Sequence, residues 1–295
     1  MELQKATRQK VKLRLGLSAV SGGGKTYSAL KLGKGLVGSY EKIAVIDTEN
    51  NSASLYSHLG GFNTISLRPP YSPERYIEAI KTCEDAGMDL IIIDSIAHEW
   101  EGQGGVLELC EQAGGGFQNG WKLMTPRHEK FKQAILQSKC HIITTVRRKQ
   151  EYALQEQTNK QGRLVQAPVK LGLKEITREG WEYEVTTNLE IDVRHFASAT
   201  KDRTELFVNA DPFIITEATG VMIKEWCEKG IDAPPPPAAW FLTPESKAEL
   251  QGLIKSSTLD THSSLMAYTV IDGAQDQATI DKVKARLLQV QNPSI

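Results

Sequence analysis

Short apolar runs alternate with longer polar segments over the first half of the chain. Four of these runs have the length and the aliphatic content of buried strands in a parallel sheet. They cover residues 13–20, 42–47, 88–95 and 141–146. Segments with the pattern or the boundary residues of helices separate them, and we expect helices at 27–36, 73–86, 106–113 and 126–138. The alternation predicts an α/β fold with a mostly parallel central sheet flanked by helices.

The pattern is less regular after residue 146. Residues 147–181 show no clear periodicity, so we expect a long loop there, which in a compact domain is usually functional or disordered. Further strands are expected after this loop, and then a last core helix at 223–229. The expected strands are 183–186, 189–193, 195–199 and 205–208.

Four consecutive prolines at 234–237 form a stiff spacer and indicate a domain boundary. The predicted organisation is a core at 1–232, a proline-rich linker at 233–239 and a small helical C-terminal region at 240–295. In the last region, Thr243-Pro244 is expected to cap a helix that ends near Ser256, and an amphipathic helix is expected near the C-terminus. This region carries no recognisable chemistry, which favours a role in binding a partner or in self-association.

The apolar run at 13–20 leads directly into a glycine-rich loop and then into a helix. This order predicts a phosphate-binding loop, because glycines let backbone N–H groups close around a phosphate and the helix N-terminus favours its charge. We expect Lys25 to reach the β- and γ-phosphates of ATP, and the Thr26 hydroxyl to bind Mg²⁺. A glycine-rich turn with a chance Lys-Thr is the alternative, and the flanking strand and helix argue against it. The predicted nucleotide-binding residues are Ser21, Gly22, Gly23, Gly24, Lys25, Thr26 and Tyr27.

One position departs from the strict pattern of this motif. The first glycine is replaced by Ala19, which is compatible with the loop if its φ angle is negative.

Candidate catalytic residues follow the other strands, at the edge of the sheet where α/β proteins bind ligands. Glu49 is expected near the γ-phosphate, where a carboxylate orients and deprotonates the attacking water. The alternative role for Glu49 is to cap the next helix, and Glu99 is the rival catalytic carboxylate. Asp94 ends an apolar run and is expected to hold Mg²⁺ through water. Thr145 and Arg147 are candidate sensors of the γ-phosphate.

Composition and charge narrow the function classes. The chain has 295 residues, 40% of them hydrophobic and 24% charged, as is ordinary for a globular protein. No apolar run approaches the roughly 18 residues of a membrane-spanning helix, and the N-terminus does not resemble a secretory signal. The four cysteines are widely spaced, which argues against a zinc site or a disulfide framework and favours the cytoplasm.

The net charge of −1 does not itself indicate a nucleic-acid partner, but its distribution is uneven. Residues 1–14 are basic, and residues 147–178 carry eight basic side chains against three acidic ones. Solvated surface charge is the plain explanation of both segments. The second segment also contains an aromatic residue for stacking, so we expect it to bind single-stranded nucleic acid. The candidate DNA-binding residues are Arg147, Arg148, Lys149, Tyr152, Lys160 and Arg163.

The order of these motifs resembles the RecA-like P-loop ATPase core. It is most similar to phage-encoded AAA-type nucleotide-binding proteins that include minimal RecA-core single-strand annealing recombinases. The resemblance covers residues 10–230 and implies that Glu49 is the catalytic glutamate. It also makes 102–120 and 147–178 look like two DNA-binding loops. Lys201 and Arg203, which are otherwise ordinary edge-strand charges, would complete a neighbour's ATP site in a ring or filament. The N-terminal polymerisation segment of full recombinases is not recognisable, and the C-terminal region has no counterpart.

Three function classes follow. The first is an ATP-dependent recombinase or annealing protein on single-stranded DNA, in the cytoplasm of a bacterial host if the protein is phage-encoded. The second is a DNA motor or helicase loader whose C-terminal tail docks to a replication or recombination protein. The third is a nucleotide-gated regulatory protein with little turnover, which Glu49 and the two candidate trans-acting cations disfavour.

Overall fold

The computed structural model describes residues 5–113, 117–158, 164–178, 180–232, 244–256, 259, 261–273 and 277–291, with the backbone alone for 150–173. The chain divides into two compact units, residues 1–232 and residues 233–295. The predicted linker at 233–239 lies outside the described residues.

The first unit is built on one sheet of eight strands, ordered β3-β2-β4-β5-β1-β7-β8, with β6 paired to β5 alone. Neighbouring strands from β3 to β7 in this order run parallel, whereas β8 is antiparallel to β7 and β6 is antiparallel to β5. The predicted mostly parallel sheet is therefore confirmed. The strands are β1 (Arg14–Ala19), β2 (Ile43–Asp47), β3 (Asn63–Ser66), β4 (Leu90–Asp94), β5 (His141–Thr158), β6 (Leu164–Glu175), β7 (Thr187–Ile191) and β8 (Ala197–Asp202).

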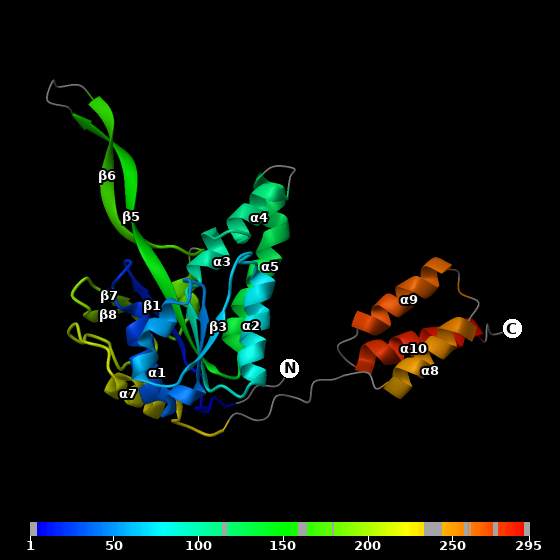
Figure 1. The fold of residues 1–295 in the computed structure, drawn as a ribbon. Helices are drawn as coiled ribbons and strands as arrows, with labels where there is room; N and C mark the ends of the chain where they lie inside the picture. Colours follow the sequence, from blue (N-terminus) through cyan, green and yellow to red (C-terminus); the bar gives the residue numbers. More distant parts are fainter. Residues whose placement is uncertain are drawn as a thin grey trace. The chain divides into compact units, whose positions relative to one another are not determined.

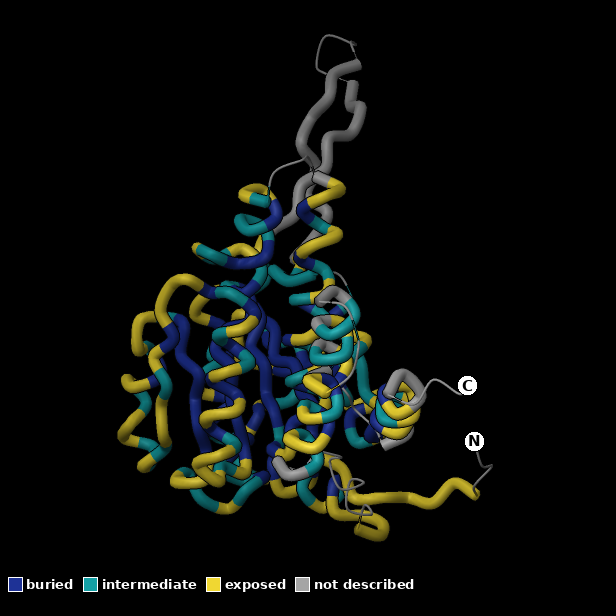
Figure 2. The backbone as a smooth tube through the Cα atoms, turned by 90° about the vertical axis from the view of Figure 1, so that its right-hand side faces the viewer, coloured by how far each residue is buried: buried dark blue, intermediate teal, exposed yellow. Residues whose placement is uncertain are grey.

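Helices cover both faces of this sheet (Figure 1). Successive residues of a strand point to opposite faces of the sheet, so each face presents apolar side chains that a layer of helices buries. Ile43 and Val45 of β2 pack into one apolar cluster with helices α1 and α7, whereas Ala44 and Ile46 pack into a second cluster with α2 and α5. In Figure 2 the buried strands form the centre of the unit. The helices are α1 (Lys25–Val37), α2 (Pro73–Asp85), α3 (Ala97–Glu101), α4 (Val106–Gln112), α5 (Phe117–Gln137), α6 (Trp181–Glu184) and α7 (Glu217–Cys227), with 3₁₀ turns at Tyr40–Lys42 and Ser52–Leu59.

Two glycines let α1 and α7 approach each other closely. A Cβ atom on Gly35 of α1 would lie 1.8 Å from the carbonyl oxygen of Glu217, and one on Gly220 of α7 would lie 2.0 Å from that of Leu32. Any side chain at either position would therefore push the helices apart. The helix that follows the glycine-rich loop is thus fixed against the last helix of the first unit.

The expected loop at 147–181 is mostly a β-hairpin, which corrects the sequence prediction. β5 continues past its buried part to Thr158 and pairs antiparallel with β6, from Arg148 opposite Glu175 to Thr158 opposite Leu164. The register shifts between Glu151 and Tyr152. The hairpin projects from one end of the unit (Figure 1). The sequence of this segment shows no sustained alternation of apolar and polar residues, because two strands that leave the sheet need no buried apolar face.

Other boundaries also differ from prediction. The last core helix, expected at 223–229, is α7, which begins earlier, at Glu217, and ends at Cys227. α5 begins at Phe117 and holds Pro126 in its interior, so it is longer than the expected helix at 126–138. Residues 183–186 include the end of α6, and the strand begins only at Thr187. Residues 205–208 form bends, because the Asp202 carboxylate accepts backbone hydrogen bonds from Thr204 and Phe207 and closes a turn.

The described residues of the second unit form three helices, α8 (Pro244–Ser256), α9 (Thr261–Gly273) and α10 (Gln277–Gln291). α8 begins and ends where the sequence predicts, α10 matches the expected C-terminal helix, and α9 was not foreseen. Their buried contacts form a small apolar core. Its members are Leu250, Ile254, Ile271, Ile280 and Leu287.

In the described parts of both units, no helix combines the length and the apolar character that crossing a bilayer requires.

Candidate nucleotide site

The glycine-rich loop connects β1 to α1 in the geometry of a phosphate-binding loop. Gly22 and Gly24 have φ angles of 78° and 82°, a backbone conformation that favours glycine. Ala19 is not among the residues with positive φ, so the condition for its substitution is met. A Cβ atom on Gly23 would lie 2.7 Å from the Cβ of Ala19. Glycine at 23 therefore makes room for alanine at 19.

A cavity of about 620 Å³ opens over this loop. It lies at the carboxyl ends of β1, β2 and β7, which meet at one edge of the sheet. The structure thus brings the predicted loop residues together with Glu49, although Gly23 is not one of the lining residues. The cavity is lined by Ser21, Gly22, Gly24, Lys25, Thr26, Tyr27, Ser28, Glu49, Ser52, Leu55, Tyr56, Arg194, His195, Ile214 and Ile215.

Lys25 is buried at the floor of this cavity, and its ammonium donates to the carbonyl of Val20 at 3.3 Å. Burial lowers the pKa of Lys25, and the negative charges of Asp94 and Glu49 act in the opposite direction. A buried ammonium gains stability from an anion placed beside it. The environment of Lys25 therefore fits the binding of a phosphate.

Two threonine hydroxyls converge on the Asp94 carboxylate. Thr26 donates to Oδ2 and Thr145 donates to Oδ1, each at 2.5 Å. Burial raises the pKa of Asp94, while these two hydrogen bonds favour its charged form. The predicted sensor Thr145 thus contacts the carboxylate in this structure.

The side chains of Thr26 and Asp94 have the chemistry that Mg²⁺ binding requires. The ion prefers hard oxygen ligands and is usually held by one or two carboxylates together with substrate phosphates. Thr26 and Asp94 supply a hydroxyl and a carboxylate side by side. Among the described residues there is no cluster of three or more His, Cys, Asp or Glu side chains that could hold a metal by itself. The donor set fits a nucleotide-bound Mg²⁺.

The loop that carries Glu49 is folded by its neighbour Asp47. The buried Asp47 carboxylate accepts backbone hydrogen bonds from Glu49 at 2.7 Å and from Ala53 at 2.8 Å. Glu49 is itself free of this capping role, and its side chain lines the cavity. Its Oε1 accepts a hydrogen bond from Nε of Arg147 at 2.9 Å.

Glu99, the rival catalytic carboxylate, has a different environment. It is 1% exposed and contacts Nδ1 of His128 at 3.1 Å. Burial raises the pKa of Glu99, and His128 counteracts this effect. Glu99 is not one of the residues that line the nucleotide cavity. Of the two candidate carboxylates, Glu49 is therefore the one that faces the cavity.

Sequence reasoning missed the residues that β7 contributes. Arg194 and His195 follow β7 and line the cavity, and Nδ1 of His195 lies 3.4 Å from the Gly23 carbonyl oxygen. Tyr56 was also missed; its ring centroid lies 5.9 Å from that of Tyr27, which gives the cavity an aromatic wall. A signal existed for the first pair, since 189–193 was recognised as a strand. What was unknown was that this strand runs beside β1.

The three consecutive cations Arg147, Arg148 and Lys149 pair with carboxylates of the same unit. Their partners are Glu49, Glu190 and Glu101, respectively. The side chain of Tyr152 and all of Lys160 and Arg163 lie outside the described residues. The expected single-strand surface is thus a hairpin whose described basic residues contact the body of the unit.

Lys201 and Arg203 do not line the nucleotide cavity of their own chain. They lie at the end of the edge strand β8, and both donate to the carbonyl oxygen of Tyr183, Arg203 at 3.3 Å. Arg203 directly follows β8, and both side chains point toward the same carbonyl oxygen.

Two cations of the basic N-terminal segment are used inside the fold. Arg8 donates to the carbonyl of Trp226 at 2.9 Å and stacks 4.2 Å above its ring. Arg14 is buried and donates to the Cys140 carbonyl at 2.8 Å, among other carbonyls near the end of α5. Arg14 is therefore not the solvated surface charge of the plain explanation, and both cations contribute to the packing of the unit.

The fold and this cavity define a P-loop protein with an ATPase-type nucleotide-binding domain. Residues 11–209 match the family described as AAA domain, and the match covers more than half of the chain. The chain therefore belongs to the AAA-domain family. No curated protein sequence matches it at a significant level.

Proposed function

We propose that this protein is a Mg²⁺-dependent ATPase that acts on single-stranded DNA, as a phage-type recombinase or single-strand annealing protein of the RecA-like class. The observation that carries the ATPase part is the convergence of Lys25, the Thr26–Asp94 pair and Glu49 on one cavity. These are the groups that phosphoryl transfer to water requires: a cation, a metal site and a base.

Each residue has a distinct task in this proposal. Lys25 and the loop amides bind and orient the phosphates, and the aromatic pair Tyr27 and Tyr56 provides an apolar wall for the base. Thr26 and Asp94 hold Mg²⁺, which neutralises phosphate charge when it is bound. Glu49 accepts a proton from the attacking water.

The DNA part rests on the hairpin and on the resemblance. β5 and β6 extend from the same edge of the sheet that carries the nucleotide cavity. A two-stranded ribbon with basic residues offers an extended surface for a phosphate backbone. A homo-oligomer, in which Lys201 and Arg203 reach a neighbour's nucleotide, is part of the proposal, as is docking of the C-terminal unit to a replication or recombination protein. A DNA motor or helicase loader is the second candidate, since the same core and hairpin serve translocation.

The ATPase proposal is tested by three matched variants. Lys25→Ala should abolish ATP binding or hydrolysis in a folded protein. Glu49→Gln should bind ATP and Mg²⁺ but hydrolyse it on the order of 100-fold more slowly, because only activation of water is lost. Glu99→Gln is the control and should keep most of the activity. Full hydrolysis by Lys25→Ala would refute the nucleotide site, and slow hydrolysis by Glu99→Gln alone would transfer the role of base to Glu99.

The DNA proposal is tested by ATPase assays with single-stranded oligonucleotides, combined with a strand-annealing readout. Lys160→Ala combined with Arg163→Ala should weaken single-strand binding and reduce its salt dependence, while ATP affinity stays constant. Annealing supports a recombinase, whereas directional strand displacement supports a motor. If Lys201 and Arg203 act between subunits, the specific activity should rise with protein concentration and Lys201→Ala should remove that rise.

A further inference from the structure

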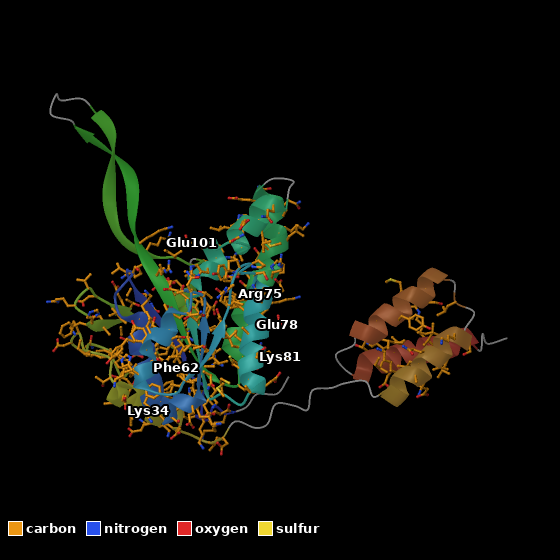
Figure 3. All side chains as sticks on the ribbon, in the orientation of Figure 1. Lys34, Phe62, Arg75, Glu78, Lys81 and Glu101 are labelled. Carbon is orange, nitrogen blue, oxygen red and sulfur yellow. The ribbon has the colours of Figure 1, made fainter. Side chains whose placement is uncertain are left out.

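The base of the hairpin is attached to the ATPase unit by three consecutive ion pairs. Arg147 pairs with Glu49 at 2.9 Å, Arg148 pairs with Glu190 of β7, and Lys149 pairs with Glu101 of α3 at 3.2 Å. Glu101 is labelled in Figure 3, at the end of the unit from which the hairpin projects. The first pair differs from the others because its acidic member is the proposed catalytic base.

Arg147 also connects the hairpin to the glycine-rich loop through the backbone. It is the last residue of β5 paired with β1, opposite Ala19, where the loop begins. Its carbonyl oxygen accepts a hydrogen bond at 2.8 Å from the backbone of Ile176, directly after β6 leaves the hairpin. Both strands of the hairpin therefore contact Arg147, which pairs with the residue that precedes the glycine-rich loop.

The ion pair changes what Glu49 can do. A carboxylate oxygen that accepts a hydrogen bond from a guanidinium has less lone-pair capacity for a water molecule. Oε1 of Glu49 is engaged in this way. The pair is accessible from outside, since the Arg147 side chain is 37% exposed and the Glu49 side chain 23% exposed. Glu49 lines the nucleotide cavity, whereas Arg147 does not, so the ion pair joins a cavity residue to the base of the hairpin.

We infer that Arg147 is a positioning residue that restrains Glu49, and that a single strand of nucleic acid bound at the base of the hairpin stimulates hydrolysis by drawing the guanidinium onto its phosphates. This inference rests on the proposed function and specifies how the DNA site and the ATP site communicate. A phosphodiester competes for the Nε–H donor that now binds the carboxylate, and it can also accept from the other N–H groups of the guanidinium. Released from Arg147, Glu49 accepts the water's proton with both oxygens available.

The test compares Arg147→Gln with a matched control. Arg127 also forms an ion pair with a glutamate, Glu74 at 2.6 Å, and is 33% exposed, but it lies on α5, away from the hairpin. Steady-state ATP hydrolysis is measured without DNA and with a saturating oligodeoxythymidine of about 30 nucleotides. Arg147→Gln should raise the basal kcat about tenfold at unchanged KM and reduce the stimulation by DNA to less than about twofold. Arg127→Gln should keep wild-type values of both.

Two further variants keep the inference falsifiable. Arg147→Lys retains the charge without the guanidinium group, so its basal rate should fall between those of the wild type and Arg147→Gln. Adding Glu49→Gln to Arg147→Gln should erase the gain, because the effect passes through Glu49. A basal rate that falls in a folded Arg147→Gln protein, or an unchanged ratio of stimulated to basal rate, would overturn the inference. If wild-type protein does not bind the oligonucleotide, or if Lys25→Ala stays active, the proposed function itself fails.

Discussion

The two halves of β5 are one continuous strand in two different environments. From His141 to Val146 the strand lies between β4 and β1 in a parallel sheet, with helices on both faces. Beyond Arg147 it pairs with β6 alone. The inner half therefore carries the stability of the core, and the outer half carries a surface whose contacts are local. Arg147, at the junction, belongs to both.

The difference shows how one strand connects a buried sheet to a hairpin that lies outside it. The inner half places Thr145 on the Asp94 carboxylate and so contributes to the proposed metal site. The outer half begins with three cations, each held by an acidic residue of the body. A change in the outer half can alter these ion pairs without disturbing the buried ladder. The halves should accordingly respond very differently to substitution.

The largest difference in stability should appear when a buried side chain of the inner half is truncated and the outer half is shortened. Ile143 is fully buried, so Ile143→Ala should lower the free energy of unfolding by about 4 kcal/mol. Tyr152 and Lys170 face each other in the hairpin, so residues 153–169 can be replaced by a two-residue turn between them. This shortening should change the stability by less than about 1 kcal/mol, because an isolated two-stranded hairpin is marginally stable. Denaturant unfolding of both variants measures the contrast, and equal losses would contradict it.

A smaller effect should appear at the start of the inner half, where His141 accepts a hydrogen bond from the Leu13 amide at 3.0 Å. Burial lowers the pKa of His141 from 6.5 to about 3. The folded state thus binds this proton less readily than the unfolded state. The contribution of neutral His141 to the free energy of unfolding is fully present above pH 6.5 and is lost as the pH falls towards 3.

Protonation of His141 in the unfolded state should lower the free energy of unfolding by about 2 kcal/mol between about pH 6.5 and about pH 4.5. His141→Asn keeps an acceptor near the Leu13 amide but cannot take up the proton. Chemical denaturation at a series of pH values should therefore give a shallower decline for the variant than for the wild type. Parallel curves would show that His141 does not cause the decline.

The smallest effect is expected at the outer half, in the pair between Lys149 and Glu101. Their side chains are 65% and 38% exposed, so water and salt screen the interaction. Glu101→Gln should change the free energy of unfolding by less than about 0.5 kcal/mol. A loss as large as that of Ile143→Ala would mean that the base of the hairpin is part of the core. Thermal unfolding at low and high salt provides the measurement.

The sequence predicted those parts of the fold and site whose signals are local. The glycine-rich loop, its strand and its helix are contiguous, and parallel strands made it possible to expect Asp94 beside Thr26. The α/β class followed from strands buried on both faces, since such strands must be apolar. Glu49 lines the cavity because it follows a strand that the sequence made recognisable, β2.

The parts that escaped prediction depend on contacts between distant residues. Arg194 and His195 reach the cavity only because β7 pairs with β1, and no local pattern encodes that order. The segment at 102–120 resembled a DNA-binding loop, yet it contains α4 and the start of α5, in which Gly120 lies. A Cβ atom there would meet the Cys110 carbonyl oxygen at 2.3 Å, so this glycine serves the packing of α4 against α5. The ion pairs of residues 147–149 could not be predicted either, because their acidic partners are distant in the sequence.

The close contact between α1 and α7 has a consequence for how this protein varies in evolution. Gly35 and Gly220 each face the backbone of the opposite helix, so neither can acquire a side chain while the other helix stays in place. The two positions should therefore drift together: related chains that lose one glycine should also differ at the other, or in the length of the turn before α7. Such paired changes would identify this helix crossing in sequences alone, across branches where little else remains alike.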